Sequence, residues 1–211
     1  INRISIGGQS FNPDTLSQLG RIHNGDATRQ AIELAIKAGF KRINLDLMYG
    51  LPQQSVQQAI DDLKTFLSYQ LEHLSWYQLN IEANTLFAAK PPILPSSHFI
   101  DEMDMLGADL LRKHGYHQYE ISAWTNNLPS LHNLNYWLFG DYIGIGCGAH
   151  GKITTHPFQI TRTIKQKHPK AYMEKDMVQL QEVVNQKDII LEYIIGHMRT
   201  REPLYFQTFE K

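Results

Sequence analysis

Strand-like and helix-like segments alternate along most of this chain, and this alternation limits the fold more than any other feature. Residues 3–9 read as a strand, residues 28–38 carry an apolar helical face, and residues 42–48 read as a second strand. The alternation continues to about residue 146. Because parallel strands need crossover connections, usually helices, the pattern predicts an α/β fold with parallel strands.

The second of these strands separates apolar from polar side chains. Side chains alternate across a strand, so one face carries Ile43, Leu45 and Leu47, and the other carries Asn44, Asp46 and Met48. We expect helices to cover the apolar face, and the polar face to carry the chemistry.

Local signals predict where helices begin and end. Ser55, with Gln58 three residues on, is typical of a capping box at the start of a helix. Gly39 and Gly115 are each predicted to supply the left-handed residue that ends a helix.

Later segments extend the pattern and then change it. Further strands are predicted at residues 74–81, 117–124 and 142–146, and a helix at residues 99–114. From about residue 171 the apolar spacing reads as helical. We therefore expect two domains, a barrel portion at residues 1–157, and a linker with an incomplete helical domain at residues 158–211.

Composition excludes several classes of protein. A net charge of −1 and short, broken basic clusters argue against a nucleic-acid partner. A single cysteine, Cys147, excludes an internal disulfide framework, and no apolar run approaches the roughly 20 residues that span a membrane. We expect a cytoplasmic location. Because Ile1 opens directly into a strand, we also expect the chain to be cut from a longer protein.

Three polar residues lie where the predicted strands end. Asp46 and Gln9 come near the carboxyl ends of adjacent strands, where ligands of barrel and open α/β folds bind, and Arg21 follows a Leu-Gly turn. Together they offer a carboxylate, an amide and a planar donor fork suited to a carboxylate. Taken singly, Asp46 could cap a turn or pair with a lysine, Gln9 could be structural, and Arg21 could be solvated.

The order and spacing of these residues resemble one known family. Gln9 lies within Gly-Gln-Ser-Phe, Arg21 follows twelve positions later, and Asp46 lies within Asn-Leu-Asp-Leu-Met-Tyr-Gly-Leu-Pro. These strings are similar to the S-adenosylmethionine-contacting segments of oxygen-independent coproporphyrinogen III oxidases and their relatives. Residues 132–137, His-Asn-Leu-Asn-Tyr-Trp, are most similar to the HemW-type branch, whose members are described as heme chaperones. One departure is Gly8, where the family pattern usually has valine.

The resemblance implies a fold and a cofactor. The fold would be the C-terminal part of a partial TIM-type (β/α) barrel of the radical S-adenosylmethionine kind, followed by the start of a small helical domain. Asp46 would bind the ribose hydroxyls of S-adenosylmethionine, Gln9 would hydrogen-bond the cofactor, and Arg21 would meet the methionyl carboxylate. The family's Cys-x3-Cys-x2-Cys motif, which binds a [4Fe-4S] cluster, is absent here, and Cys147 cannot replace three thiolates. We therefore expect no metal site in these residues and no radical chemistry from them alone.

Heme is a further ligand that the resemblance implies, with His132 as the candidate ligand residue. A neutral imidazole is a competent axial ligand for heme iron, and Tyr136 and Trp137 could stack on a flat macrocycle. The plainer alternative is that His132 is hydrogen-bonded in a packed loop.

Three functions follow from these observations. The resemblance favours a heme-binding chaperone that keeps the radical S-adenosylmethionine scaffold and delivers heme to acceptor proteins. The alternative is an oxygen-independent coproporphyrinogen III oxidase, an oxidoreductase of porphyrin biosynthesis whose substrate is a porphyrinogen. A third reading, an unrelated barrel enzyme for a phosphorylated metabolite, has no distinct phosphate motif to support it.

Overall fold

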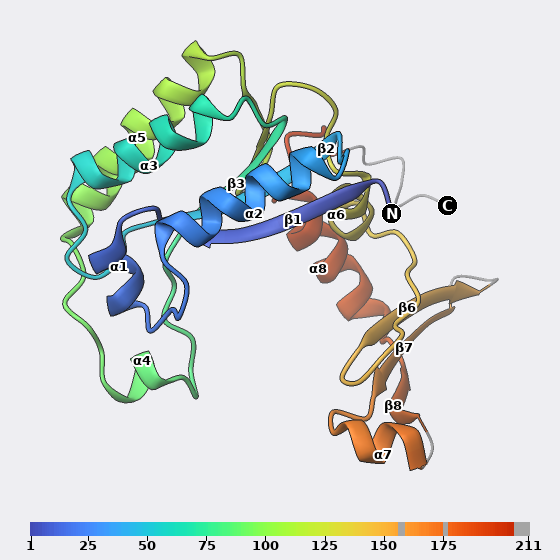
Figure 1. Ribbon diagram of the computed structural model, residues 1–211. Helices are drawn as coiled ribbons and strands as arrows, with labels where there is room; N and C mark the ends of the chain where they lie inside the picture. Colours follow the sequence, from blue (N-terminus) through green and yellow to red (C-terminus); the bar gives the residue numbers. More distant parts are fainter. Residues whose placement is uncertain (156–158, 175–176, 205–211) are drawn as a thin grey trace. The chain divides into compact units, whose positions relative to one another are not determined.

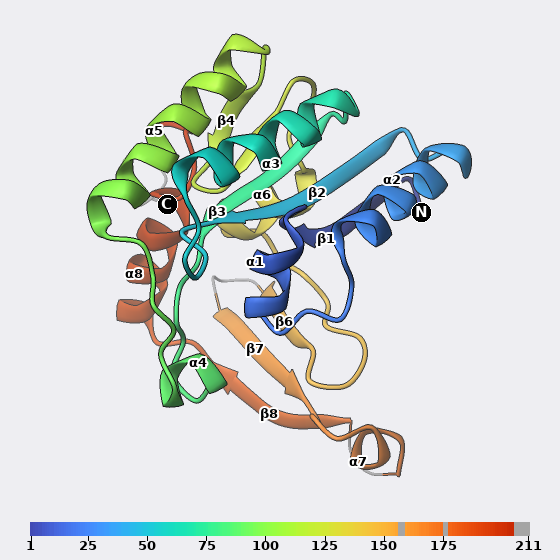
Figure 2. The same ribbon diagram turned by 60° about the vertical axis from the view of Figure 1, so that its left-hand side comes forward.

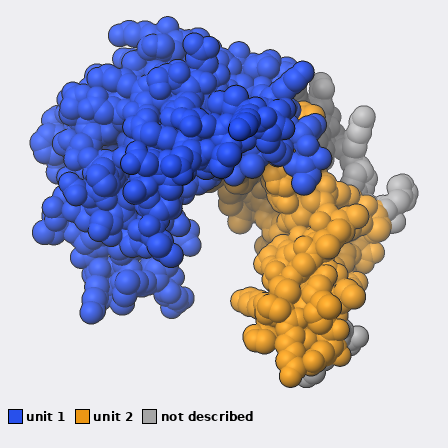
Figure 3. All heavy atoms as spheres, viewed as in Figure 1, with its two compact units in different colours: residues 1–129 blue, residues 130–211 orange. Residues whose placement is uncertain are grey.

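The chain forms two compact units, residues 1–129 (unit 1) and residues 130–211 (unit 2), which are coloured separately in Figure 3. The computed structural model describes residues 1–155, 159–174 and 177–204. The domain boundary expected at residues 157/158 lies outside the described residues.

Unit 1 is built on a five-stranded sheet in the order β1-β2-β3-β5-β4, which Figures 1 and 2 show from two sides. Its strands are β1 (Arg3–Gln9), β2 (Arg42–Tyr49), β3 (His73–Gln78), β4 (His117–Glu120) and β5 (Ala123–Thr125). Its helices are α1 (Pro13–Gln18), α2 (Gly25–Lys37), α3 (Val56–Ser68), α4 (Leu86–Ala89) and α5 (Ser97–Lys113). The first three strands run parallel, as predicted, whereas β5 pairs antiparallel with both β3 and β4.

Helices α2, α3 and α5 lie along one face of this sheet (Figures 1 and 2), and the hydrophobic core fills the space between. Ile43, Leu45 and Leu47 of β2 all enter this core, which confirms the predicted apolar face. Trp76 of β3 packs against Gly107 of α5, where an added Cβ would lie only 1.8 Å from the indole ring. The opposite face of β2 is therefore free to carry the polar side chains.

Short-range signals in the sequence fix the ends of these helices. Ser55 and Gln58 form the reciprocal capping box at the start of α3, with the Ser55 hydroxyl accepting from the Gln58 amide at 3.2 Å. Gly39 and Gly115 adopt φ values of 85° and 83° where α2 and α5 end. The sequence interpretation of these three sites was correct.

The segment at residues 117–124, predicted to be one strand, forms a hairpin. Residues 117–124 form β4 and the start of β5, joined by a turn at Ile121 and Ser122. Gln118 Nε2 donates to the Ile121 carbonyl at 2.9 Å and holds this turn. The antiparallel pairing results from this turn, which strand-like composition did not reveal.

Unit 2 contains a three-stranded antiparallel sheet in the order β6-β7-β8. Its elements are α6 (Leu131–Trp137), β6 (His150–Thr155), β7 (Gln159–Lys165), α7 (Pro169–Glu174), β8 (Val178–Val183) and α8 (Gln186–His197). The expectation of helical structure from residue 171 was wrong for residues 178–183, which form β8. There Val178 and Leu180 alternate with glutamines at the two-residue period of a strand.

Two further predictions in unit 2 were wrong. Residues 142–146 form no strand, and only Tyr142 makes an isolated bridge, to Lys152. Gly144 instead packs so closely that an added Cβ would lie 2.4 Å from the His150 carbonyl oxygen. Residues 132–137 belong to helix α6 rather than a loop, because Ser130 caps that helix.

Helices long and apolar enough to cross a membrane do not occur among the residues that the structure describes.

Candidate functional site

The carboxylate of Asp46 is held on the polar face of β2 by two neighbouring side chains. Asn44 Nδ2 donates to Asp46 Oδ1 at 2.7 Å, and Ser5 Oγ donates to Asp46 Oδ2 at 3.2 Å. Asn44 Nδ2 also donates to Ser5 Oγ at 2.7 Å, which closes the set. Asp46 is half-buried, so its carboxylate is oriented and still reachable from solvent.

Gln9 reaches the same edge of the sheet through a β-bulge. In the pairing of β1 with β2, Gly7 lies opposite Asp46 and Gln9 opposite Leu47, so Gly8 is an extra residue. Gln9 itself has φ 58°, in the left-handed region. The two-residue alternation of Arg3, Ser5 and Gly7 therefore does not continue to Gln9.

The side chain of Gln9 nevertheless folds back over Gly7. Its Nε2 lies 2.7 Å from the position that a Gly7 Cβ would take, and Gly7 shares its face of β1 with Ser5. The Gln9 side chain is buried, and its Oε1 accepts no hydrogen bond. Gln9 thus brings a free buried acceptor to the strand position opposite Asp46.

Asp62 of α3 anchors the chain just after this bulge. Its carboxylate accepts a hydrogen bond from Ser10 Oγ at 2.6 Å and from the Phe11 amide at 2.7 Å. Burial raises the pKa of the Asp62 carboxyl to about 6, although both of these hydrogen bonds and the charge of Arg29 work in the opposite direction. The fixed turn at Ser10 and Phe11 limits where Gln9 can lie.

Arg21 is exposed and follows the C-terminal cap of α1. Its amide donates to the Leu16 carbonyl at 3.0 Å, and the amide of Gly20, which has φ 68°, donates to Ser17 at 3.0 Å. This Schellman-type cap fixes the backbone from which the Arg21 side chain extends.

Tyr77 of β3 lies within the electrostatic reach of both Asp46 and Arg21. Burial raises the pKa of the Tyr77 hydroxyl, the charge of Asp46 raises it further, and the charge of Arg21 lowers it. In unit 1, two of the predicted site residues, Asp46 and Arg21, therefore lie near enough to the Tyr77 hydroxyl to affect its pKa. Sequence reasoning missed Tyr77, although its place in the predicted third strand could have suggested it.

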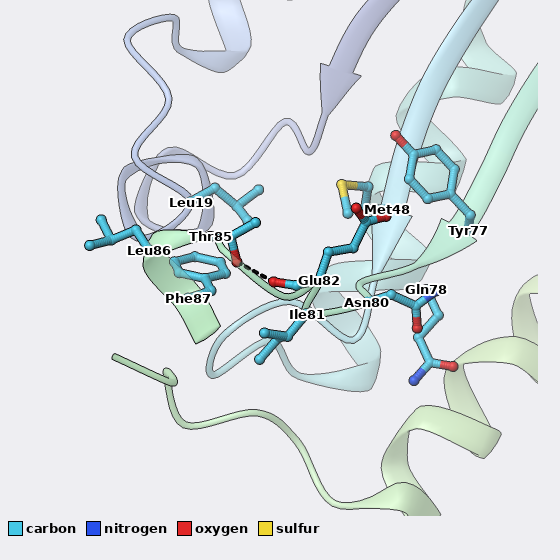
Figure 4. Close-up of a pocket in the computed structure, with 10 residues that line it drawn as sticks. All are labelled: Leu19, Met48, Tyr77, Gln78, Asn80, Ile81, Glu82, Thr85, Leu86 and Phe87. Carbon is cyan, nitrogen blue, oxygen red and sulfur yellow. Dashed lines mark hydrogen bonds between the residues drawn. The ribbon is translucent and has the colours of Figure 1, made fainter. Parts of the chain in front are cut away.

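A pocket of about 490 Å³ opens beside these residues. It is lined by Leu19 at the end of α1, by Met48 and Tyr77 at the ends of β2 and β3, and by the segment from Gln78 to Phe87, as Figure 4 shows. Thr85 Oγ1 donates to the Glu82 carbonyl at 2.6 Å and shapes this segment. The carboxyl ends of the parallel strands thus border a cavity in which most of the lining surface is apolar.

His132 lies in unit 2, on the exposed side of α6. Its ring meets Tyr136 edge-on, with centroids 4.8 Å apart, and Tyr136 in turn packs at 4.5 Å against Tyr142. His132 is thus an accessible imidazole beside an aromatic pair, and it does not lie in the packed loop of the alternative interpretation.

The described residues offer no cluster for a metal ion. Within residues 1–155, 159–174 and 177–204, no three His, Cys, Asp or Glu side chains are grouped to hold one. Cys147 is exposed and free.

No protein-family model matches the chain, but the sequence is similar to several proteins of the same name. It is 46% identical over 211 residues to the heme chaperone HemW of Haemophilus influenzae, covering 100% of this chain and 55% of that protein. It is 46% identical over 203 residues to the heme chaperone HemW of Escherichia coli, covering 96% of this chain and 54% of that protein. The chain therefore spans about half the length of the curated relatives it matches.

The fold also has a solved counterpart. The structure of coproporphyrinogen III oxidase (HemN) from Escherichia coli, described as a radical SAM enzyme, matches with a TM-score of 0.79 and 21% identity. The match covers 100% of this chain and 52% of that one, so unit 1 and unit 2 correspond to part of that α/β fold. At 46% identity to two HemW proteins over nearly all its length, the chain belongs to the same family as these HemW proteins.

Proposed function

We propose that this chain supplies the S-adenosylmethionine-binding strands and a heme-binding element of a heme chaperone. The observation that carries this proposal is the grouping of Gln9, Asp46 and Tyr77 in the C-terminal halves of three adjacent parallel strands. Ligands of barrel folds bind at that end of the strands. The similarity to two HemW heme chaperones supports the chaperone function.

The donors and acceptors of unit 1 suit the cofactor. An oriented, half-buried carboxylate at Asp46 can accept hydrogen bonds from two neighbouring ribose hydroxyls. The buried Oε1 of Gln9 lacks a partner and can accept one more bond, and the planar fork of Arg21 suits the methionyl carboxylate. These residues bind and orient the cofactor.

The [4Fe-4S] cluster of the family would supply the electron for radical chemistry, and its cysteine ligands are not among these 211 residues. We therefore assign no catalytic residue here.

Heme would bind at His132 of α6. The ring is exposed, and the neighbouring Tyr136 and Tyr142 offer flat surfaces to a macrocycle. Heme-accepting proteins are the partners that this function requires. The cytoplasmic location and the absence of a nucleic-acid partner stay predictions from composition.

The alternative function is oxygen-independent coproporphyrinogen III oxidation. The test uses the full-length protein, reconstituted anaerobically with iron and sulfide, and incubated with S-adenosylmethionine, a reductant and coproporphyrinogen III. Mass spectrometry that finds no decarboxylation, together with stoichiometric heme binding by absorbance, would support the chaperone. Loss of two carboxyl groups per tetrapyrrole would reject it in favour of the oxidase.

A further inference from the structure

A chain of hydrogen bonds runs through unit 1 from Tyr119 to Asp46. Tyr119 Oη lies 2.7 Å from His73 Nε2, His73 Nδ1 lies 2.6 Å from Asn44 Oδ1, and Asn44 Nδ2 lies 2.7 Å from Asp46 Oδ1. The four residues come from β4, β3 and β2. Of these four hydrogen-bonded residues, only Asp46 belongs to the proposed cofactor site.

The carboxylate of Asp46 fixes which atom donates and which accepts in each of these hydrogen bonds. A carboxylate only accepts, so the amide nitrogen of Asn44 must face Asp46, and its Oδ1 must face His73. His73 Nδ1 must then carry the hydrogen that it donates to Oδ1, which leaves Nε2 to accept from the Tyr119 hydroxyl. Arg3 Nη2 lies 3.4 Å from the same Nδ1, and an N–H cannot accept from a guanidinium, so this contact is not a hydrogen bond.

Burial keeps His73 in the neutral form that this arrangement needs. The side chain is fully buried, and burial, with smaller effects from the charges of Arg3 and Arg42, lowers its pKa to about 3. A neutral imidazole has one donor and one acceptor, as the two contacts require. A second proton would turn Nε2 into a donor and reverse the direction of its hydrogen bond with the Tyr119 hydroxyl.

A second β-bulge aims Tyr119 at His73. The register between β4 and β5 shifts between Gln118 and Glu120, so Tyr119 is the extra residue. Its ring meets the imidazole edge-on, with centroids 5.6 Å apart. Ser75 Oγ adds a donor to Asn44 Oδ1 at 3.2 Å, in support of His73.

From this geometry we propose that His73, held by Tyr119, is a positioning residue that sets the orientation of the Asp46 carboxylate through the amide of Asn44. This inference rests on the proposed role of Asp46 in binding S-adenosylmethionine. Without the Nδ1–H donor the Asn44 amide can turn over, which places Oδ1 against the carboxylate and repels it. Cofactor affinity would then fall although no cofactor contact has been removed.

The test measures S-adenosylmethionine affinity by calorimetry in the full-length, reconstituted protein. We expect Asp46→Ala to weaken binding about tenfold or more, and His73→Leu about threefold to tenfold. The variant that combines both substitutions should bind no more weakly than Asp46→Ala alone, because His73 acts through Asp46. His73→Gln keeps a donor and an acceptor and should bind within about twofold of the parent.

Each other outcome has a definite meaning. If His73→Leu weakens binding by the same factor with and without Asp46, or leaves binding unchanged, the positioning role is rejected. An unchanged affinity in Asp46→Ala would instead reject the proposed cofactor role of Asp46. If His73→Leu fails to fold, Tyr119→Phe decides by the same comparison, with an expected loss of about twofold to fivefold only when Asp46 is present.

Nitrogen NMR of the histidine-labelled protein gives a readout that needs no cofactor. We expect an Nδ1–H tautomer signal that disappears in His73→Gln, and finding His73 as the Nε2–H tautomer would contradict the inference.

Discussion

Gln9 occupies the space that a side chain at Gly7 would fill, with Gln9 Nε2 2.7 Å from the ideal Gly7 Cβ position. Two features of β1 make this possible. The extra residue Gly8 shifts the register, and the left-handed backbone of Gln9 turns its side chain back along the strand. The absence of a side chain at Gly7 is thus part of how the proposed cofactor ligand is placed.

Replacing Gly7 by alanine should displace the amide of Gln9. Real Cβ atoms do not approach another heavy atom to 2.7 Å, and the flexible end of Gln9 can move more easily than the strand. We expect S-adenosylmethionine binding to weaken by on the order of 1 kcal/mol, about fivefold in Kd, with little change in thermal stability. Calorimetry on the reconstituted full-length protein measures the loss.

The matched control for Gly7→Ala is the same substitution combined with Gln9→Ala. Without the glutamine amide the new methyl group has room, so Gly7→Ala should then cost no further affinity. An equal loss in both backgrounds would show that Gly7 acts on the strand rather than on Gln9.

Asp62 should make the protein less stable as the pH rises. Its pKa in the folded state, raised by burial to about 6, exceeds the ordinary value of 3.8 that the unfolded chain has. Between these values the folded state holds more protons than the unfolded state, so stability is present at low pH and is lost as the pH rises through about 6. Relative to Asp62→Asn, the parent should lose on the order of 2 kcal/mol of unfolding free energy between about pH 4 and about pH 7.

Denaturant unfolding of parent and Asp62→Asn across this pH range tests the sign. Asparagine keeps an acceptor for the Phe11 amide and cannot ionise. Other carboxylates contribute equally to both proteins and cancel in the difference. A difference that stays constant with pH, or that grows in favour of the parent at higher pH, would contradict the raised pKa.

The sequence was informative wherever a residue pattern acts locally. The alternation in β2, the Ser55 capping box and the glycines that end α2 and α5 each depend on neighbours within a few positions, and each was predicted. The three candidate residues Gln9, Arg21 and Asp46 came from spacing and resemblance. Their joint role in binding the cofactor stays a prediction.

What the sequence did not predict depends on contacts between distant segments. The bulges at Gly8 and Tyr119 arise from pairing with β2 and β5. A two-residue alternation of side chains in the sequence does not reveal where such an extra residue lies. Asp62 bonds to Ser10, 52 positions away, and His73 bonds to Tyr119, 46 positions away, so neither contact could be predicted from neighbouring residues. In unit 2, strand β8 has only six residues and most of them are exposed, so no two-residue alternation of burial marks it as a strand.

The contact between Gly107 and Trp76 predicts a large stability effect away from the site. An alanine methyl at residue 107 would lie 1.8 Å from the indole, so α5 must move away from β3 or Trp76 must leave its buried position. We expect Gly107→Ala to lower the free energy of unfolding by roughly 1 to 3 kcal/mol. Met105→Ala, at an exposed position of the same helix, is the control and should change stability by less than about 0.5 kcal/mol. Equal stability of the two variants in denaturant unfolding would mean that Trp76 does not pack against α5.

His132 should be needed for heme binding if it is the axial ligand. We expect His132→Ala to weaken heme binding by about tenfold or more and to change the Soret absorbance of the bound heme, because an iron–nitrogen bond is lost. His150→Ala is the matched control, since His150 is also exposed and also lies in unit 2. Heme titration of the full-length protein, followed by absorbance, compares the two variants. A Soret band unchanged in His132→Ala and altered in His150→Ala would assign the iron ligand to His150, and a band unchanged in both would remove both histidines from the heme site.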